Sequence, residues 1–319
     1  MRNELFTLFF AVDPVLKESN MYNNPLVTIQ ILNWNRAEET VRAIRGALNQ
    51  SYENIEVVVV DNGSTDDSIK IIESLFPEIK LVKLDKNYGC PGGRNRGICY
   101  SSGDFIFFCD NDGVLHKDAV SNAMECMLKN DCVAIVTGLV KEFSSEAEID
   151  TSRVLPPVDF YNIHVFQGGN CLHRKSIFYE IGKFPDDYMY GGEENYLSLR
   201  VLDAGYSIIK CEQVLLWHKK STQARNIEKE SLQAWGNTLS TAFQLYPFNY
   251  FLLYFFYFSV KYPLYAINHG FLSGFLKTFC SYIKRLNKYE RTPVRNSTLK
   301  YYFKLKKEKL NNSEMIRYV

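Results

Sequence analysis

The sequence predicts an α/β fold built on a parallel sheet with covering helices. Between residues 26 and 110, short runs rich in Val, Ile, Leu and Phe alternate with segments of helical spacing. Such alternation is typical of parallel strands, which need a crossover between them. The chain has 319 residues, of which 46% are hydrophobic and 23% charged, so it can form a core as one large domain or two.

The predicted elements follow one another regularly. LVTIQILN predicts the first strand, and AEETVRAIRGALNQS predicts a helix with acidic residues in its first turn, where the helix dipole favours them. IEVVVVD is apolar almost throughout, as in strands that are buried on both faces. DDSIKIIESLF predicts a helix, IKLVKLD a strand, PGGRNRGICYSS a helix opened by glycines, and DFIFFCD the fourth strand.

Polar side chains follow each of these four strands. They are Asn33 and Asn35, Asp61, Asn87, and the acidic turn Asp110, Asn111 and Asp112. Ordinary turns also contain Asn and Asp. Because ligands of open α/β sheets bind beyond the carboxyl ends of the strands, four such clusters in succession favour one shared ligand site.

The acidic turn ends a strongly apolar strand. In an extended chain, Asp110 and Asp112 point to the same side, and their like charges repel unless a cation lies between them. Carboxylates favour Mg²⁺ or Mn²⁺, and a metal that carries a diphosphate fits this pattern; a solvated turn is the alternative. The spacing excludes an EF-hand, and GCPGGRNRG does not match a dinucleotide fingerprint.

Charge and cysteine content limit the partners and the compartment. The net charge of +1 gives no whole-molecule case for nucleic acid as a partner, but residues 277–309 contain eleven Lys or Arg against two Glu, a local charge of +9. None of the eight cysteines forms a CxxC motif, so reduced thiols in a cytoplasmic protein are expected. The apolar run near the start, flanked by Glu4 and Asp13, is expected to be an extension and not a signal peptide.

The motifs together resemble those of a known family. ILNWNR, VVVVDNGSTDDS, NYGCPGGRNRGI, GDFIFFCDND, GGNCLHRKSI and GEENYLSLRVLDAGY, within residues 26–218, look like those of the family 2 inverting glycosyltransferases, particularly the bacterial rhamnosyl- and galactofuranosyltransferase branch. The resemblance implies a GT-A fold, a Rossmann-like mixed sheet flanked by helices. The expected division is an extension (1–24), a GT-A domain (25–225) and a C-terminal helical, aromatic and basic region (226–319).

The resemblance also implies which residues bind the nucleotide-sugar donor. Asp61 is expected at the base or ribose, and the backbone around Asn33 and Asn35 is expected to frame the nucleotide. Arg94 opens a helix whose free N–H groups favour phosphate. The full expected donor set is Asn33, Asn35, Asp61, Asn87, Gly93, Arg94, Asp110, Asn111 and Gly169.

The metal and the catalytic base follow from the same resemblance. Asp110 and Asp112, with His218, are expected to hold Mg²⁺ or Mn²⁺; a histidine satisfied at the end of a buried strand is the alternative for His218. Inversion needs a group that accepts the acceptor hydroxyl's proton. Glu194 is the expected base and Glu193 its companion, although most relatives have the shorter Asp at the second place, and both acids also suit a helix N-terminus.

The C-terminal region is densely aromatic. The cleanest apolar run, residues 250–260, is shorter than the ~20 residues that a membrane-spanning helix needs. An in-plane helix beside the +9 segment would suit an anionic membrane surface. Packing on the core and formation of a homodimer are the alternatives.

These observations predict a metal-dependent inverting glycosyltransferase. We expect a UDP- or dTDP-sugar donor, a saccharide or lipid-linked acceptor in cell-surface polysaccharide or glycolipid synthesis, and a cytoplasmic location at the inner face of the membrane. A sugar-1-phosphate nucleotidyltransferase is one alternative, but NWNRAEET is not the glycine-rich basic loop it would need. A non-catalytic, membrane-associated scaffold of the same fold is the other.

Overall fold

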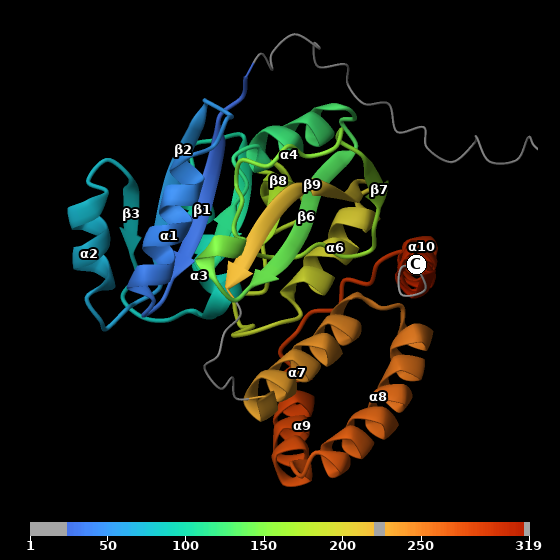
Figure 1. Cartoon of the computed structure of the whole chain (residues 1–319). Coiled ribbons are helices and arrows are strands. Elements are labelled where there is room, and N and C mark those ends of the chain that lie inside the picture. Colours follow the sequence, from blue (N-terminus) through green and yellow to red (C-terminus); the bar gives the residue numbers. More distant parts are fainter. Residues whose placement is uncertain (1–23, 220–226, 316–319) are drawn as a thin grey trace, which may run out of the picture.

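The computed structural model describes residues 24–219 and 227–315, and shows a mixed sheet with helices on both faces and further helices after it (Figure 1). Apart from Asn24, the expected N-terminal extension lies outside the described residues. The strands are β1 Val27–Asn33, β2 Ile55–Asp61, β3 Lys80–Lys83, β4 Phe105–Asp110, β5 Gly113–Leu115, β6 Val133–Phe143, β7 Phe160–Asn162, β8 Asn170–Arg174 and β9 Ser207–Lys219. The helices are α1 Ala37–Leu48, α2 Ser68–Leu75, α3 Gly89–Tyr100, α4 Ala119–Leu128, a 3₁₀ turn Glu146–Glu148, α5 Ile177–Glu180, α6 Glu193–Asp203, α7 Ile227–Leu245, α8 Phe248–Asn268, α9 Leu272–Leu286 and α10 Asn296–Met315.

The first four strands form a parallel half-sheet in the order β3-β2-β1-β4, which confirms the predicted β–α alternation. The register aligns the strand ends, because Asn33 lies opposite Asp61 and Leu32 opposite Asp110. The polar residues that follow these strands therefore meet at one edge of the sheet.

The second half of the sheet is mixed, with the order β4-β8-β6-β9-β5. β8 runs antiparallel to β4 and places Asn170 beside Cys109. β5 runs antiparallel to β9 and places Gly113 opposite His218. These two pairings bring distant segments of the chain to the acidic turn.

Side chains alternate between the two faces of the sheet, as the period of a strand requires. On β4, Phe105 and Phe107 join a core covered by α1, α2 and α4, whereas Ile106 and Phe108 join a core that contains residues of α3 and α6. Both faces are therefore buried, which explains the apolar strands of the sequence.

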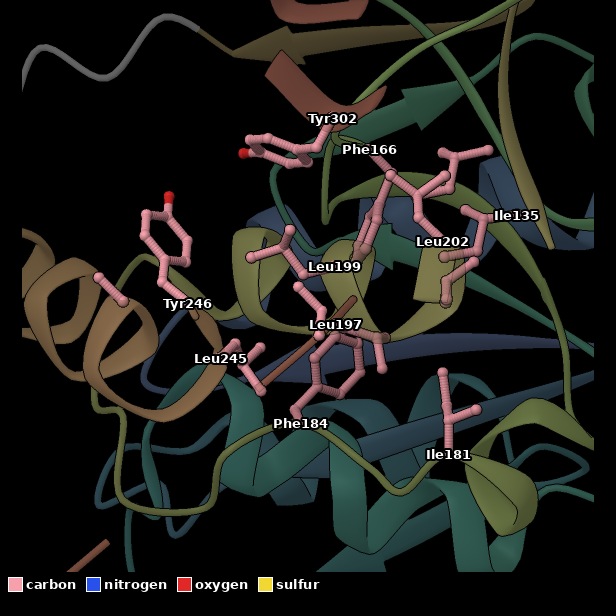
Figure 2. Packing of buried hydrophobic residues seen from close by; sticks show 14 of the residues in the cluster. Ile135, Phe166, Ile181, Phe184, Leu197, Leu199, Leu202, Leu245, Tyr246 and Tyr302 are labelled. Carbon is pink, nitrogen blue, oxygen red and sulfur yellow. The ribbon is translucent and has the colours of Figure 1, made fainter. Parts of the chain in front are cut away.

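The C-terminal helices pack against the α/β part through α6. Leu245 of α7 and Leu197 of α6 belong to one hydrophobic cluster (Figure 2), and the Tyr302 hydroxyl of α10 donates to Asn195 Oδ1 at 2.7 Å. The segment expected as a separate region thus shares a core with the sheet domain. None of the helices within the described ranges combines the length and apolarity needed to cross a membrane.

Truncation of Leu239 tests this shared core. Leu239 is fully buried in the cluster, so Leu239→Ala should lower the free energy of unfolding by about 2–5 kcal/mol in denaturant titration. Leu253→Ala on α8, where 67% of the side chain is exposed, should change it by less than about 0.5 kcal/mol. Similar values for the two variants would show that α7 does not share the core.

Candidate active site

A cleft of ≈ 800 Å³ lies at the ends of β4 and β9 and the start of α6. Its size suits a small-molecule ligand. The residues that line it are Arg36, Cys90, Arg94, Asp110, Asn111, Asp112, Val140, Glu142, Val165, Phe166, Gln167, Gly168, Gly169, Tyr190, Gly191, Glu193, Glu194, Asn195, Leu216, His218 and Glu230. The cleft therefore contains the acidic turn, both glutamates and the histidine that the sequence singled out.

Asp110, Asp112 and His218 converge on one point of this cleft. Each offers one ligand atom, and these atoms all lie within 4.8 Å of one another. His218 Nε2 lies 3.1 Å from Asp112 Oδ1. Because β4 ends at Asp110, the carboxylates meet through the turn and the pairing of β5 with β9, and not along an extended strand as the sequence suggested.

This donor set fits a divalent cation. Two carboxylates and an imidazole suit Mn²⁺, and the carboxylates also suit Mg²⁺. Burial opposes ionisation of Asp112, but the hydrogen bond and charge of His218 and the charge of Arg36 outweigh it and lower the pKa of Asp112. A carboxylate that stays ionised near neutral pH is available as a ligand.

Arg94 lies beneath the acidic turn and is almost fully buried. Its Nη2 atom is 3.1 Å from Asp110 Oδ1, its Nη1 atom is 4.0 Å from Glu193 Oε1, and its guanidinium carbon is 5.7 Å from the Phe108 ring centroid. Burial raises the pKa of Asp110 even though the charge of Arg94 opposes this. In this structure Arg94 thus compensates the charge of Asp110 and of the buried Glu193, and a contact with phosphate remains a prediction.

The two glutamates open α6. Gly192, with φ 92°, precedes them in the left-handed region that glycine tolerates. Glu193 is buried and its Oε2 atom has no hydrogen-bond partner, whereas Glu194 is partly exposed to the cleft. Burial and the charge of Glu193 raise the pKa of Glu194 to about 7, which suits a general base near neutral pH.

A buried asparagine of α7 supports the turn before these glutamates. Asn237 Nδ2 donates to the carbonyl oxygens of Tyr190 and Gly191, at 3.0 and 2.8 Å. The Tyr282 hydroxyl of α9 donates to Asn237 Oδ1 at 3.1 Å. No local sequence pattern predicts this contact, because it joins segments that share no motif.

Two glycines allow the acids to lie close together. A Cβ atom at Gly169 would be 1.7 Å from Asp110 Oδ2, and one at Gly168 would be 2.7 Å from Glu194 Oε1. The backbone of Gly169 also accepts a hydrogen bond from Asp110 N at 3.0 Å. Gly169 was expected beside the donor sugar; the structure places it against the acidic turn.

Asn33, Asn35 and Asp61 form a neighbouring network and are not among the residues that line the cleft. Asn33 Nδ2 donates to Asp61 Oδ2 at 2.8 Å, and Ser64 N donates to Asp61 Oδ1 at 2.9 Å. Asn35, with φ 54°, accepts a hydrogen bond from Thr65 N at 2.7 Å. These bonds shape the loops after β1 and β2, and contact with a nucleotide remains a prediction.

Asn111 connects this network to the cleft. Its Nδ2 atom donates to Thr40 Oγ1 at 3.4 Å, and Thr40 Oγ1 donates to Asn33 Oδ1 at 2.7 Å. The ends of β1, β2 and β4 are thus joined by side-chain hydrogen bonds.

Asn87 and Gly93 have clear roles in the local fold. Asn87 Oδ1 accepts hydrogen bonds from Gly89 N at 2.8 Å and Asn62 Nδ2 at 3.1 Å, at the start of α3. A Cβ atom at Gly93 would be 2.5 Å from Leu32 Cδ1, so a larger residue would require the Leu32 side chain to move. Their expected donor-binding roles remain predictions.

The sequence analysis missed Arg36. Its Nη1 atom lies 3.0 Å from Asp112 Oδ2, and the side chain lines the cleft. A cation placed between the first strand and its helix, where anions tend to bind, was the available signal.

The chain is similar in sequence to known glycosyltransferases. The sequence model of the family "Glycosyl transferase family 2" matches residues 28–182. An uncharacterised glycosyltransferase of Haemophilus influenzae is 38% identical over 35% of this chain and 46% of its own length. A GalNAc(5)-diNAcBac-PP-undecaprenol beta-1,3-glucosyltransferase of Campylobacter jejuni is 30% identical over 53% of this chain and 57% of its own length.

Among solved structures, the mannosyltransferase PcManGT from Pyrobaculum calidifontis, in complex with GDP-Man and Mn²⁺, is similar. The TM-score is 0.56 at 17% identity, over 82% of this chain and 75% of the other. This likeness confirms the GT-A fold. The chain spans only about half the length of the two curated relatives described above.

Substitution of Gly169 tests the metal-site geometry. In Gly169→Ala the added methyl group would overlap Asp110, so the affinity for Mn²⁺ should fall at least about 10-fold, the effect of ~1.4 kcal/mol. Calorimetric titration with Mn²⁺ measures this, and thermal unfolding shows that the variant is folded. Unchanged Mn²⁺ affinity in folded Gly169→Ala would place the ion elsewhere.

Because the pKa of Glu194 is raised, replacing this residue with glutamine should stabilise the protein more at high pH than at low pH. Below the unfolded-state value of about 4.5 the carboxyl group is neutral in both states, and above about pH 7 the folded protein must hold the charge in a buried site. Glu194→Gln should therefore raise the Tm of chelator-treated protein on the order of 2 °C at pH 8 and less at pH 5. The same Tm difference at both pH values would mean that Glu194 has an ordinary pKa.

Proposed function

Because residues 28–182 belong to glycosyl transferase family 2 and the chain has the GT-A fold, we propose that it is a metal-dependent, inverting glycosyltransferase. This proposal rests on one observation: a set of metal-ligating side chains and a candidate general base share one cleft. The metal-ligand set of Asp110, Asp112 and His218 lies in the same cleft as Glu194, whose pKa is raised.

The proposed donor is a nucleotide sugar, with UDP or dTDP as the nucleotide on the basis of the sequence resemblance. PcManGT, which has the same fold, was solved with a nucleotide sugar and Mn²⁺. A divalent ion at Asp110, Asp112 and His218 would neutralise charge on the departing nucleoside diphosphate. Arg36, beside Asp112, adds a cation that phosphate would attract.

The proposed reaction is a single displacement in which Glu194 is the base. Its carboxylate accepts the proton of the acceptor hydroxyl as that oxygen attacks the sugar. Glu193 is too buried to be the first choice for this role; its charge raises the pKa of Glu194, and Arg94 lies between Glu193 and Asp110. Arg94 thereby connects Asp110 to Glu193, the neighbour of the proposed base.

The proposed acceptor is a saccharide or a lipid-linked saccharide of a cell-surface polysaccharide or glycolipid. The name of the Campylobacter relative describes a saccharide on undecaprenyl diphosphate, which supports a lipid-linked acceptor as one form. The proposed location is the cytoplasmic face of the membrane, where the protein would reach a lipid-linked acceptor.

The rival functions are less well supported. A nucleotidyltransferase would need a basic, glycine-rich loop after β1, and the residues there are Trp34, Asn35 and Arg36. A non-catalytic scaffold would have no need for a glutamate with a pKa raised toward neutrality beside a metal-ligand set.

Two substitutions test the proposed function. A ligand that binds the native state raises its Tm, so a nucleotide sugar that binds with Mn²⁺ should raise the Tm of the wild-type protein. Asp112→Ala should abolish both this shift in Tm and sugar transfer, because a metal ligand is lost. Glu194→Gln should keep that shift but lower kcat by about 10²-fold or more, since only the proton acceptor is lost. Activity of Glu194→Gln near the wild-type rate would exclude Glu194 as the base.

A further inference from the structure

The outward face of α8 is apolar along its whole length. Leu253, Phe256, Val260, Leu264 and Ile267 recur at helical spacing, and more than half of each side chain is exposed. We call these five residues the α8 face. In Figure 1, α8 forms one outer side of the group α7–α9. A helix that is apolar on all sides is normally covered, so something is expected to lie against this face.

The opposite side of α8 is buried in the hydrophobic core. Phe251, Phe258 and Ala266 are buried in the cluster that also contains α6 and α7 residues, and the Phe258 ring stacks on Phe279 of α9, with the centroids 6.0 Å apart. The helix therefore cannot leave the fold without losing buried apolar contacts. Any partner must meet α8 side-on, with the helix lying along the partner's surface.

The edges of the α8 face have amphipathic side chains. Tyr257 and Tyr265 flank it, and both are exposed. The Lys261 ammonium lies 5.2 Å from the Tyr257 ring centroid, so its charge sits at the edge while its stem lies along apolar surface. Tyrosine and lysine beside an aliphatic strip are typical of helices at a membrane–water interface.

The basic charge that follows α8 favours a membrane over a second copy of the chain as the partner of the α8 face. Residues 277–309 carry a local charge of +9. Within the described part of this segment, several lysines are exposed and form no ion pair: Lys277, Lys284, Lys288, Lys300, Lys306 and Lys307. Anionic headgroups would attract this charge, whereas a second copy of the chain carries the same basic segment.

We propose that the α8 face lies in the surface of an anionic lipid bilayer, with α8 parallel to the membrane plane. The aliphatic and phenylalanine side chains enter the acyl boundary, and the lysines of α9 and α10 contribute attraction to the headgroups. This contact needs no transferase activity, so it can be tested independently of the proposed function.

The test is co-sedimentation of the full chain with vesicles. Wild-type protein should bind vesicles of phosphatidylglycerol and phosphatidylcholine, bind pure phosphatidylcholine more weakly, and lose affinity as salt is raised. Phe256→Asp with Val260→Asp should lower the affinity for anionic vesicles by at least about 10-fold, because two apolar side chains no longer enter the lipid. The control, Tyr179→Asp with Val154→Asp, places two aspartates at an exposed aromatic residue and an exposed valine outside α8 and should bind like wild type.

Two further measurements distinguish loss of membrane binding from unfolding and from a change in oligomeric state. Thermal unfolding of each variant shows whether it is folded, and sedimentation velocity without lipid shows its oligomeric state. Wild-type protein that fails to bind anionic vesicles, or α8 variants that bind as well as wild type, would overturn the proposal. A wild-type dimer that becomes monomeric in the α8 variant would overturn it too, and would make a second copy the partner.

Discussion

The structure around the cleft depends on how the negative charge at the end of β4 is balanced. Asp110 ends a buried strand and Asp112 follows it in the turn, so the two carboxylates are held close together, and the side chain of Asp112 is mostly shielded from solvent. Arg94 balances Asp110 from below, and His218 and Arg36 contact Asp112. Without these cations, two like charges so near each other would not remain ionised. A divalent ion fits on the side of the turn that faces the cleft.

The same constraint explains why the two glutamates that open α6 lie where they do. Arg94 lies between the acidic turn and Glu193, and Gly168 and Gly169 remove the side chains that would hold the groups apart. The C-terminal helices add support, because Asn237 of α7 binds the backbone just before α6. The region after the sheet is thus part of the scaffold of the cleft as well as the carrier of the α8 face.

The sequence predicts the parallel half of the fold well because its signals are local. Apolar strands, amphipathic helices and the polar residues after each strand can each be identified within a dozen residues, and the register of β1, β2 and β4 confirms that their ends meet. The mixed half is different. The approach of Gly169 to Asp110 and of His218 to the acidic turn depends on the pairings of β8 with β4 and of β5 with β9, which no local pattern encodes. The hydrogen bond between Asn33 and Asp61 likewise depends on the pairing of β1 with β2, and contact of either residue with a nucleotide remains a prediction.

We propose that Asp110, Asp112 and His218 bind a divalent cation that in turn holds a nucleoside diphosphate. Isothermal titration calorimetry with UDP, dTDP and GDP, in the presence of Mn²⁺ and of a chelator, measures this coupling. At least one of these nucleotides should bind about 10-fold or more tightly when Mn²⁺ is present, equivalent to ~1.4 kcal/mol. Equal affinity with and without the metal for all three would contradict it.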